Sequence, residues 1–276
     1  MDINNYRVTW VHGIGNAPAG YSNPWRKAFN THLSFPDSNY IEVLWSTVYK
    51  AMMQALNLAK PGIPLTPQEQ AAEADLRKAL ETILAARRPT TAPPQGTPLL
   101  REWSETAGAE AVSLPPWILD SHDYIGEFTQ YLVSRRVRNA VKEKFKQQLR
   151  PLAGRGHSIS VIAHSWGSVV AYESLIDLEV DLPNLKLANL FTLGSPLWMV
   201  RYLLDDRSGR KPRNISKWIN IDAQGDVIGA GLKPGFQVDQ DFAVPNFKNS
   251  NEPHNSYFLE GNTSVQRDIV AKTLKK

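Results

Sequence analysis

The stretch Ala163-His164-Ser165-Trp166-Gly167 directly follows an apolar run, Ile159-Ser160-Val161-Ile162. Small residues two positions before and after a serine are typical of a nucleophile elbow, a sharp turn from a strand into a helix that leaves the serine hydroxyl at its apex. Because that turn brings strand and helix close together, the flanking side chains must be small. We therefore expect a strand, a strained turn at Ser165 and a helix, as in an α/β fold.

A second strand followed by a loop is predicted at the N-terminus. Val8-Thr9-Trp10-Val11 predicts a short buried strand, and His12-Gly13-Ile14-Gly15 follows it at once. Glycine lets a loop backbone approach a ligand closely, and two backbone N–H groups commonly stabilise the oxyanion of an acyl-transfer intermediate. We predict that the N–H groups of Ile14 and Trp166 are these donors. The supporting loop then consists of His12, Gly13 and Gly15; the alternative is a plain glycine turn.

Two aspartates follow a predicted late strand at 217–221. Asp222 stands at the strand end, and Asp226 lies beyond it in a Gly225-Asp226 turn. A carboxylate on such a loop can orient an imidazole and stabilise it when it is charged. We predict Asp226 as this acid because it is free to point back across the strand edge, and Asp222 stays the alternative. Aspartate after glycine also occurs simply as a turn residue.

One histidine has the right place in the chain for a general base. The six histidines are at positions 12, 32, 122, 157, 164 and 254, and His254 alone lies downstream of both Ser165 and Asp226 on a polar loop. Histidine titrates near neutral pH and so suits general-base catalysis. We predict that role for His254; the alternative is a solvated loop histidine.

In this order the segments resemble the α/β-hydrolase family, and its lipase- and esterase-like members in particular. That family places its triad in the order Ser, Asp or Glu, His, which Ser165, Asp226 and His254 follow. The resemblance implies a serine hydrolase that cleaves small-molecule or lipid esters through an acyl-enzyme, without a cofactor. The alternatives are acyl transfer to another acceptor by the same triad, and a hydrolase-fold protein that binds a lipid or partner without chemistry.

Short apolar runs predict the sheet. Such runs suit parallel strands that are covered on both faces, and the helical stretches between them indicate right-handed crossovers. We expect one domain over residues 1–276, with a trimmed, mostly parallel sheet of about six strands, helices on both faces and a helical cap insertion at about 50–120. The predicted strands are Val8–Val11, Ile41–Leu44, Ile159–Ala163, Leu190–Leu193, Trp218–Ile221 and a weaker run at Phe242–Val244.

The insertion is expected to contain an amphipathic helix from Gln68 to Arg88, followed by a Pro- and Thr-rich loop from Pro89 to Pro98. It is either a lid that excludes water from the site or a helix packed on the core without a gating role. The apolar positions of the helix are Ala72, Leu76, Leu80, Ile83 and Leu84, and further apolar surface comes from Trp103, Trp117, Ile118 and Leu119.

Composition excludes several classes of protein. The chain of 276 residues has no cysteine, which rules out disulfides, thiol catalysis and thiolate metal sites. The histidines lack metal-ligand spacing, so we predict no metal site. No segment reaches 18 consecutive apolar residues, and the N-terminus lacks a basic stretch followed by an apolar one. We therefore expect no transmembrane segment and a cytoplasmic protein. Export by a route that needs no cleaved signal is the alternative.

The net charge is +4, and seven basic residues fall within one predicted helix. Such a stripe either contacts an anionic lipid surface or is simply a solvated helix face. No nucleic-acid-binding motif accompanies it, so we expect no nucleic-acid partner. The stripe comprises Arg135, Arg136, Arg138, Lys142, Lys144, Lys146 and Arg150, and the same helix has an apolar side of Val137, Val141, Phe145 and Leu149.

Overall fold

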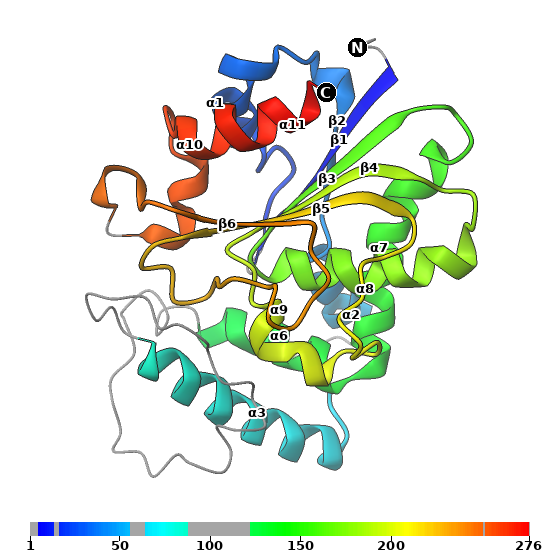
Figure 1. Cartoon of the computed structure of the whole chain (residues 1–276). Coiled ribbons are helices and arrows are strands. Elements are labelled where there is room, and N and C mark those ends of the chain that lie inside the picture. Colours follow the sequence, from blue (N-terminus) through cyan, green and yellow to red (C-terminus); the bar gives the residue numbers. More distant parts are fainter. Residues whose placement is uncertain (1–4, 14–16, 56–63, 88–121, 251, 276) are drawn as a thin grey trace.

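A computed structural model describes residues 5–13, 17–55, 64–87, 122–250 and 252–275. In these ranges six strands form one sheet in the order β2-β1-β3-β4-β5-β6, and every neighbouring pair is parallel (Figure 1). The prediction of an α/β fold with about six mostly parallel strands is confirmed. The strands are β1 (Tyr6–Val11), β2 (Tyr40–Val43), β3 (Ser158–His164), β4 (Leu187–Leu193), β5 (Ile215–Ala223) and β6 (Gln240–Val244).

Helices connect these strands and cover the sheet. The longer ones are α1 (Asn23–Leu33), α2 (Thr47–Ala55), α3 (Pro67–Ala86), α6 (His122–Val133), α7 (Arg135–Leu149) and α8 (Trp166–Asp181). The shorter ones are η2 (Asp37–Asn39), η3 (Arg150–Leu152), α9 (Leu197–Val200), η4 (Arg201–Leu203), η5 (Phe247–Asn249), η6 (Pro253–Phe258), α10 (Thr263–Val265), η7 (Gln266–Ala271) and α11 (Lys272–Leu274).

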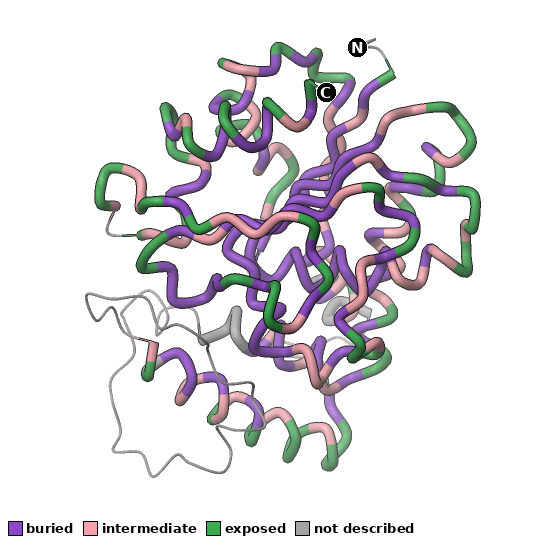
Figure 2. The backbone as a smooth tube through the Cα atoms, viewed as in Figure 1, coloured by how far each residue is buried: buried purple, intermediate pink, exposed green. Residues whose placement is uncertain are grey.

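The four inner strands, β1, β3, β4 and β5, are largely apolar because both faces of the sheet are buried there. Successive side chains of a strand point to opposite faces, so a doubly covered strand needs apolar residues throughout. In β1, Val8 and Trp10 pack in one hydrophobic cluster and Val11 in the other, all without exposed surface. Figure 2 shows the resulting buried centre, in purple, running along the strands.

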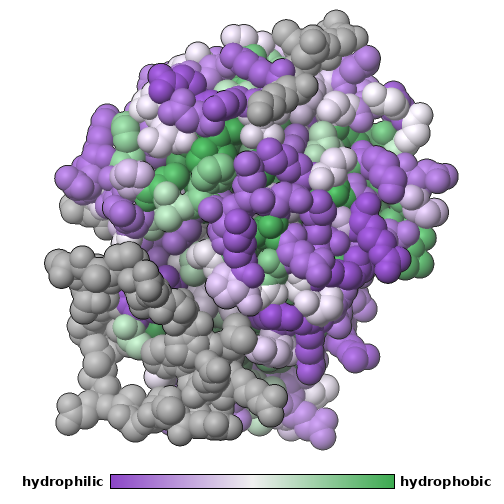
Figure 3. Space-filling view, in the orientation of Figure 1, coloured by the Kyte–Doolittle hydropathy of each residue, from purple (hydrophilic) through white to green (hydrophobic). Residues whose placement is uncertain are grey.

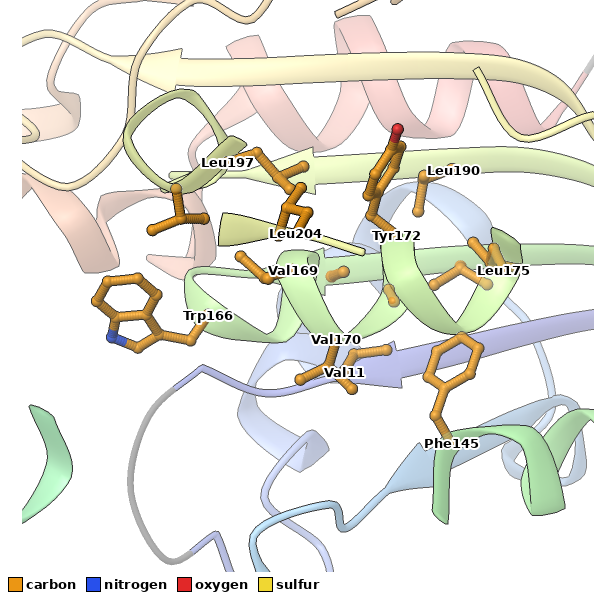
Figure 4. Close-up of a cluster of buried hydrophobic side chains, with 14 of the residues drawn as sticks. Val11, Phe145, Trp166, Val169, Val170, Tyr172, Leu175, Leu190, Leu197 and Leu204 are labelled. Atoms are coloured by element: carbon orange, nitrogen blue, oxygen red, sulfur yellow. The ribbon is translucent and has the colours of Figure 1, made fainter. Parts of the chain in front are cut away.

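Different helices cover the two faces. Helices α8 and α7 pack side by side on the face that contains Val11, with α8 against β3 and β1 and α7 against β2. In Figure 4, Val170 of α8 lies beside Val11 of β1. Helix α1 and the C-terminal segment with α10 and α11 cover the other face (Figure 1). In the orientation of Figure 3, hydrophobic surface gathers between this C-terminal segment and the sheet.

The strand order places a switch point between β1 and β3. From β1 the chain proceeds outward to β2, and it then returns to β3 and continues toward the opposite edge. Loops that leave adjacent strands at such a point part in opposite directions, and open α/β sheets bind ligands in the crevice there. Val11 pairs with Ala163 near the carboxyl ends of these two strands. The loop at His12 and the turn at Ser165 therefore lie side by side.

Part of the predicted insertion is described. Helix α3 packs on α6, on the side of α6 that faces away from the sheet (Figure 1). Leu76, Leu80, Ile83 and Leu84 are buried as predicted, whereas Ala72 is exposed. The prediction for Ala72 was wrong because the core cluster contacts only the second half of this helix. The predicted loop at 89–98, Arg88 and the apolar residues at 103 and 117–119 lie outside the described residues, and a lid role stays a prediction.

Helix α7 has the expected buried side, with Val137, Val141, Phe145 and Leu149 fully enclosed. Much of its basic stripe is paired with carboxylates of the same protein. Arg138 and Lys142 both bind Asp205, at 2.7 and 2.9 Å. The stripe therefore has a structural role between α7, α8 and the chain after η4. Further pairs join Lys146 to Asp181 and Arg150 to Glu143.

Among the described residues, no helix is long and apolar enough to cross a membrane.

Candidate active site

Ser165 lies at the turn between β3 and α8 with φ 52° and ψ −134°. For a residue with a side chain, this left-handed backbone costs about 1–3 kcal/mol and persists only where the surroundings impose it. Here the Ser165 N–H donates to the carbonyl of Leu193 at 2.9 Å, which ties the turn to the end of β4. The predicted strained turn is thus present at the predicted residue.

Two glycines make this turn possible. A Cβ on Gly167 would lie 2.1 Å from the carbonyl oxygen of His12, and one on Gly13 would lie 2.7 Å from the Cβ of Ser165. Both distances are far below van der Waals contact, so only glycine fits at either place. The loop after β1 therefore runs directly against the serine and the start of α8. Ile14 and Gly15, predicted on the same loop, lie outside the described residues.

His12 holds the start of this loop. Its Nδ1–H donates to the carbonyl of Gly13 at 2.7 Å, and its ring stacks on Trp45 with 4.9 Å between centroids. The Trp45 indole in turn donates to the His12 carbonyl at 2.9 Å. Burial lowers the pKa of His12 to about 4, so the ring is neutral at physiological pH. His12 therefore holds the described start of the loop, and its role in supporting an oxyanion donor stays a prediction.

Trp166 is the first residue of α8. The first N–H groups of a helix have no acceptor within it and lie at its positive end. The Trp166 amide is therefore suited to bind a developing negative charge next to Ser165. Its indole ring is buried and stacks on Phe128 of α6, with 3.4 Å between centroids.

Asp226 is fully enclosed and has partners for both carboxylate oxygens. The Nδ1 of His254 lies 2.9 Å from each oxygen. The N–H groups of Ile228 and Gly229 donate to Oδ1 at 2.9 and 3.0 Å, and the Tyr257 hydroxyl donates to Oδ2 at 2.6 Å. Burial by itself raises the pKa of Asp226, but the charge and hydrogen bonds of these neighbours, His254 foremost, hold that pKa well below its usual range. Asp226 is therefore ionised.

Asp222, the alternative acid, lies close to Asp226 but differs from it in hydrogen bonding and in the direction of its pKa shift. A Cβ on Gly229 would be 2.6 Å from Asp222 Oδ1 and 2.9 Å from Asp226 Oδ2, so the two carboxyl groups flank the same glycine. Asp222 Oδ1 is shielded from solvent and has no hydrogen-bond partner. Burial and the neighbouring charge of Asp226 raise the pKa of Asp222 well above its usual range, against the opposing effect of Arg87. The histidine that faces these groups, His254, binds Asp226.

His254 lies in η6 and adjoins the serine turn. Its ring centroid is 4.6 Å from that of His164, and its carbonyl accepts a hydrogen bond from His164 Nε2–H at 2.8 Å. A Cβ on Gly194 would lie 2.9 Å from His254 Nδ1, and Gly194 directly follows Leu193, the acceptor for the Ser165 N–H. His254 and Ser165 thus meet the same turn. In the described residues no hydrogen bond joins the Ser165 hydroxyl to His254; such bonds often tighten only when substrate binds.

Sequence reasoning missed three residues of this site. His164 precedes the serine and, because burial lowers its pKa to about 3, acts as a neutral donor to the His254 backbone. Tyr257 follows His254 by three residues, a spacing that places both on one side of a short 3₁₀ helix. This spacing could have indicated Tyr257 from the sequence. The third residue, Arg87, contacts Val227 in the acid loop from 140 residues away, and no local pattern indicates it.

Among the described residues, no cluster of His, Asp or Glu is suited to hold a metal ion.

Comparison with known proteins gives little further guidance. No family model matches the chain, and no curated relative matches its sequence. The structure is similar to one described as "Crystal structure of an uncharacterized protein from Pseudomonas aeruginosa", at 10% sequence identity and a TM-score of 0.30. The match covers 87% of this chain and 40% of that one, so this chain spans less than half the length of that protein. A similarity this low carries no argument about function.

Proposed function

We propose that this chain is a serine hydrolase of the α/β-hydrolase type that cleaves carboxylic esters. The observation that carries the proposal is the arrangement around Ser165. A serine in a strained strand-to-helix turn adjoins the same Leu193–Gly194 turn as His254, and the imidazole of His254 is bound through Nδ1 to the buried carboxylate of Asp226.

In the first half of the reaction, His254 Nε2 removes the proton of the Ser165 hydroxyl as the serine oxygen attacks the ester carbonyl carbon. The carbonyl electron pair moves to oxygen and forms an oxyanion. When this intermediate collapses, the carbon–oxygen bond to the alcohol breaks, and the alcohol leaves with the proton that His254 carried. An acyl group remains on Ser165.

In the second half, water attacks the acyl carbon and gives its proton to His254. Collapse of the second oxyanion breaks the bond to Ser165, which recovers a proton from His254, and the carboxylic acid is released. Every proton in this sequence moves through His254, so the steps themselves require no cofactor.

The surroundings of His254 suit these transfers. Ionised Asp226 accepts the Nδ1–H bond, which fixes the tautomer that leaves Nε2 bare to take a proton. The positive charge that His254 gains during attack is then stabilised by the same carboxylate. The N–H of Trp166 is the oxyanion donor supported by its place at the start of α8, and a second donor from Ile14 stays a prediction.

Partly exposed aromatic side chains lie next to the site and favour an ester with an apolar part. Trp25 of α1 stacks on Phe258 of η6, with 3.9 Å between centroids, and the Trp25 ring lies 5.8 Å from that of His164. Such surfaces suit an acyl or alcohol chain better than a charged group. Contact with an anionic lipid surface has weaker support, because several residues of the basic stripe are bound to carboxylates.

The test is the intact mass of the protein after incubation with a fluorophosphonate probe. We expect one adduct on the native chain and none on Ser165→Ala. A matched control is Ser195→Ala, because Ser195 is also buried and stands in a turn after a strand, but its hydroxyl is bonded to Ser168 at 2.7 Å. That variant should still form the adduct.

Two outcomes would contradict the proposal. An adduct that persists in Ser165→Ala would place the nucleophile elsewhere. A native chain that stays unlabelled, also after brief exposure to detergent, would instead indicate a hydrolase-like fold that binds a ligand without catalysis. If the adduct forms as expected, a chain-length series of esters, with and without added alcohols, then identifies the acyl group and separates hydrolysis from acyl transfer.

A further inference from the structure

Arg87 directly follows α3, and its side chain reaches the loop that carries Asp226. Its Nη1 donates to the carbonyl oxygens of Val227 and Gly229, at 3.2 and 2.6 Å. The guanidinium carbon lies 4.5 Å from the centroid of the Trp198 ring, a cation–π distance. The side chain is therefore held by two carbonyls and an aromatic face at a site far from its own helix.

These contacts act on the peptide groups that bind the acid. The peptide between Val227 and Ile228 has its oxygen bound by Arg87 and its N–H bound by Asp226. The next peptide has its oxygen bound by the Trp198 indole at 2.8 Å and its N–H bound by Asp226. Because a peptide group is planar, fixing its oxygen also fixes the direction of its N–H. Arg87 and Trp198 therefore fix the orientation of the two N–H groups that donate to Asp226.

Charge gives Arg87 a second effect on this loop. Asp222 and Asp226 flank the same glycine in a place sheltered from water, where two like charges repel strongly. Burial lowers the pKa of Arg87, but both carboxyl groups oppose this, and an arginine keeps its charge in proteins. Arg87 therefore supplies positive charge beside the ionised carboxylate that His254 needs.

We infer that Arg87 is a positioning residue for the catalytic acid, and that through it α3 of the predicted insertion sets the orientation of the Asp226 carboxylate toward His254. Arg87 acts through the carbonyls of the 227–229 loop, and among the described residues no hydrogen bond joins it to His254. The inference rests on the proposed function only in taking Asp226 as the acid. It makes this part of the insertion a component of the active site, whether or not the insertion also covers the substrate.

The first test does not depend on catalysis. The Nδ1–H proton of His254, bonded to Asp226, should give a far-downfield proton NMR signal that disappears in His254→Gln. We expect Arg87→Met to move this signal upfield or broaden it, and Arg87→Lys, which keeps a charged donor, to restore part of the native position. Arg77→Met is the matched control, because Arg77 lies on the same helix and pairs with Glu73. It should leave the signal unchanged.

The second test uses the rate of fluorophosphonate labelling in a double-mutant cycle. We expect Arg87→Met to slow labelling about 10- to 100-fold in the native background, the range for a small misplacement of a catalytic group. In an Asp226→Asn background the same change should slow labelling less than about 2-fold, because residues that act through one another are not additive. A purely structural loss would slow both backgrounds equally.

The outcomes separate this inference from the proposed function. If the native chain is not labelled, the proposed function fails, and the NMR signal still decides whether Arg87 positions Asp226. The inference is overturned by an Arg87→Met signal identical to the native one, by equal slowing in both backgrounds, or by a native protein that has no downfield signal. Circular dichroism and thermal unfolding identify a variant that has failed to fold, in which case Arg87→Lys decides.

Discussion

The serine turn at 163–167 and the acid loop at 226–229 meet at the carboxyl ends of the strands but are built in different ways. The turn is made by backbone: the close approach of Gly167 to the His12 carbonyl, and the Ser165 N–H bonded to Leu193. The acid loop is made by side chains from distant parts of the chain, with Arg87 and Trp198 on its carbonyls. Both depend on tertiary contacts, but the serine turn shows in the sequence as a local pattern of small residues, whereas no local pattern indicates the partners of the acid loop.

Replacing each of the two aspartates in turn by asparagine should give the largest difference in turnover. We expect Asp226→Asn to lower ester turnover by a factor on the order of 10⁴, because the imidazole loses the carboxylate that fixes its tautomer. Asp222→Asn should change turnover less than about 3-fold, because the raised pKa of Asp222 favours its neutral form and His254 Nδ1 is bonded to Asp226 instead. Turnover of one soluble ester by both variants is the measurement. A greater loss in Asp222→Asn would mean that the acid is Asp222.

Filling the space beside the serine turn should mainly affect stability. We expect Gly167→Ala to lower the free energy of unfolding by about 3 kcal/mol or more, because its Cβ would meet backbone that cannot rotate away. Gly154→Ala is the control: Gly154 has φ 74° but open space around it, so only the left-handed backbone costs, about 1–2 kcal/mol. Urea denaturation measures both. Equal losses would show that the close approach to His12 is not needed.

The smallest expected effect concerns pH. The folded-state pKa of Asp222 is raised above the unfolded value of about 3.9, so the folded chain keeps a proton that the unfolded chain releases. Stability contributed by this group therefore falls as pH rises from about 4 toward the folded pKa. Besides Asp226, the charged or titratable groups around Asp222 are Arg87, Asp241 and Tyr257.

Asp222→Asn cannot release that proton. We expect it to flatten the fall in stability as the pH rises from about 4 to 8, and to be more stable than the native chain at the upper end of that range. Thermal unfolding across this pH range is the measurement, and Asp75→Asn, an exposed change of the same kind on α3, is the control. If the two variants have the same pH profile as the native chain, Asp222 is ionised when folded.

The sheet was predictable because its four inner strands are buried on both faces and are therefore largely apolar. Even the weak run at 242–244 forms β6, where it pairs in parallel with β5. The helix at 68–88 was predicted from its apolar spacing, yet Ala72 is exposed. Spacing indicates which face of a helix is apolar, but not how far along that face a neighbouring element packs. The basic stripe on α7 likewise gave no sign of Asp205, which lies far along the chain and binds two of its members.

The sequence alone determined the α/β fold, the strained turn at Ser165 and the order in which Ser165, Asp226 and His254 follow the strands. Strand burial, small residues at a tight turn and chain order are all local properties. Only the tertiary structure decided which aspartate meets His254 and how the acid loop is held. Those outcomes depend on Arg87, Trp198 and Tyr257, whose contacts arise when packing excludes water and each buried polar group must find a partner.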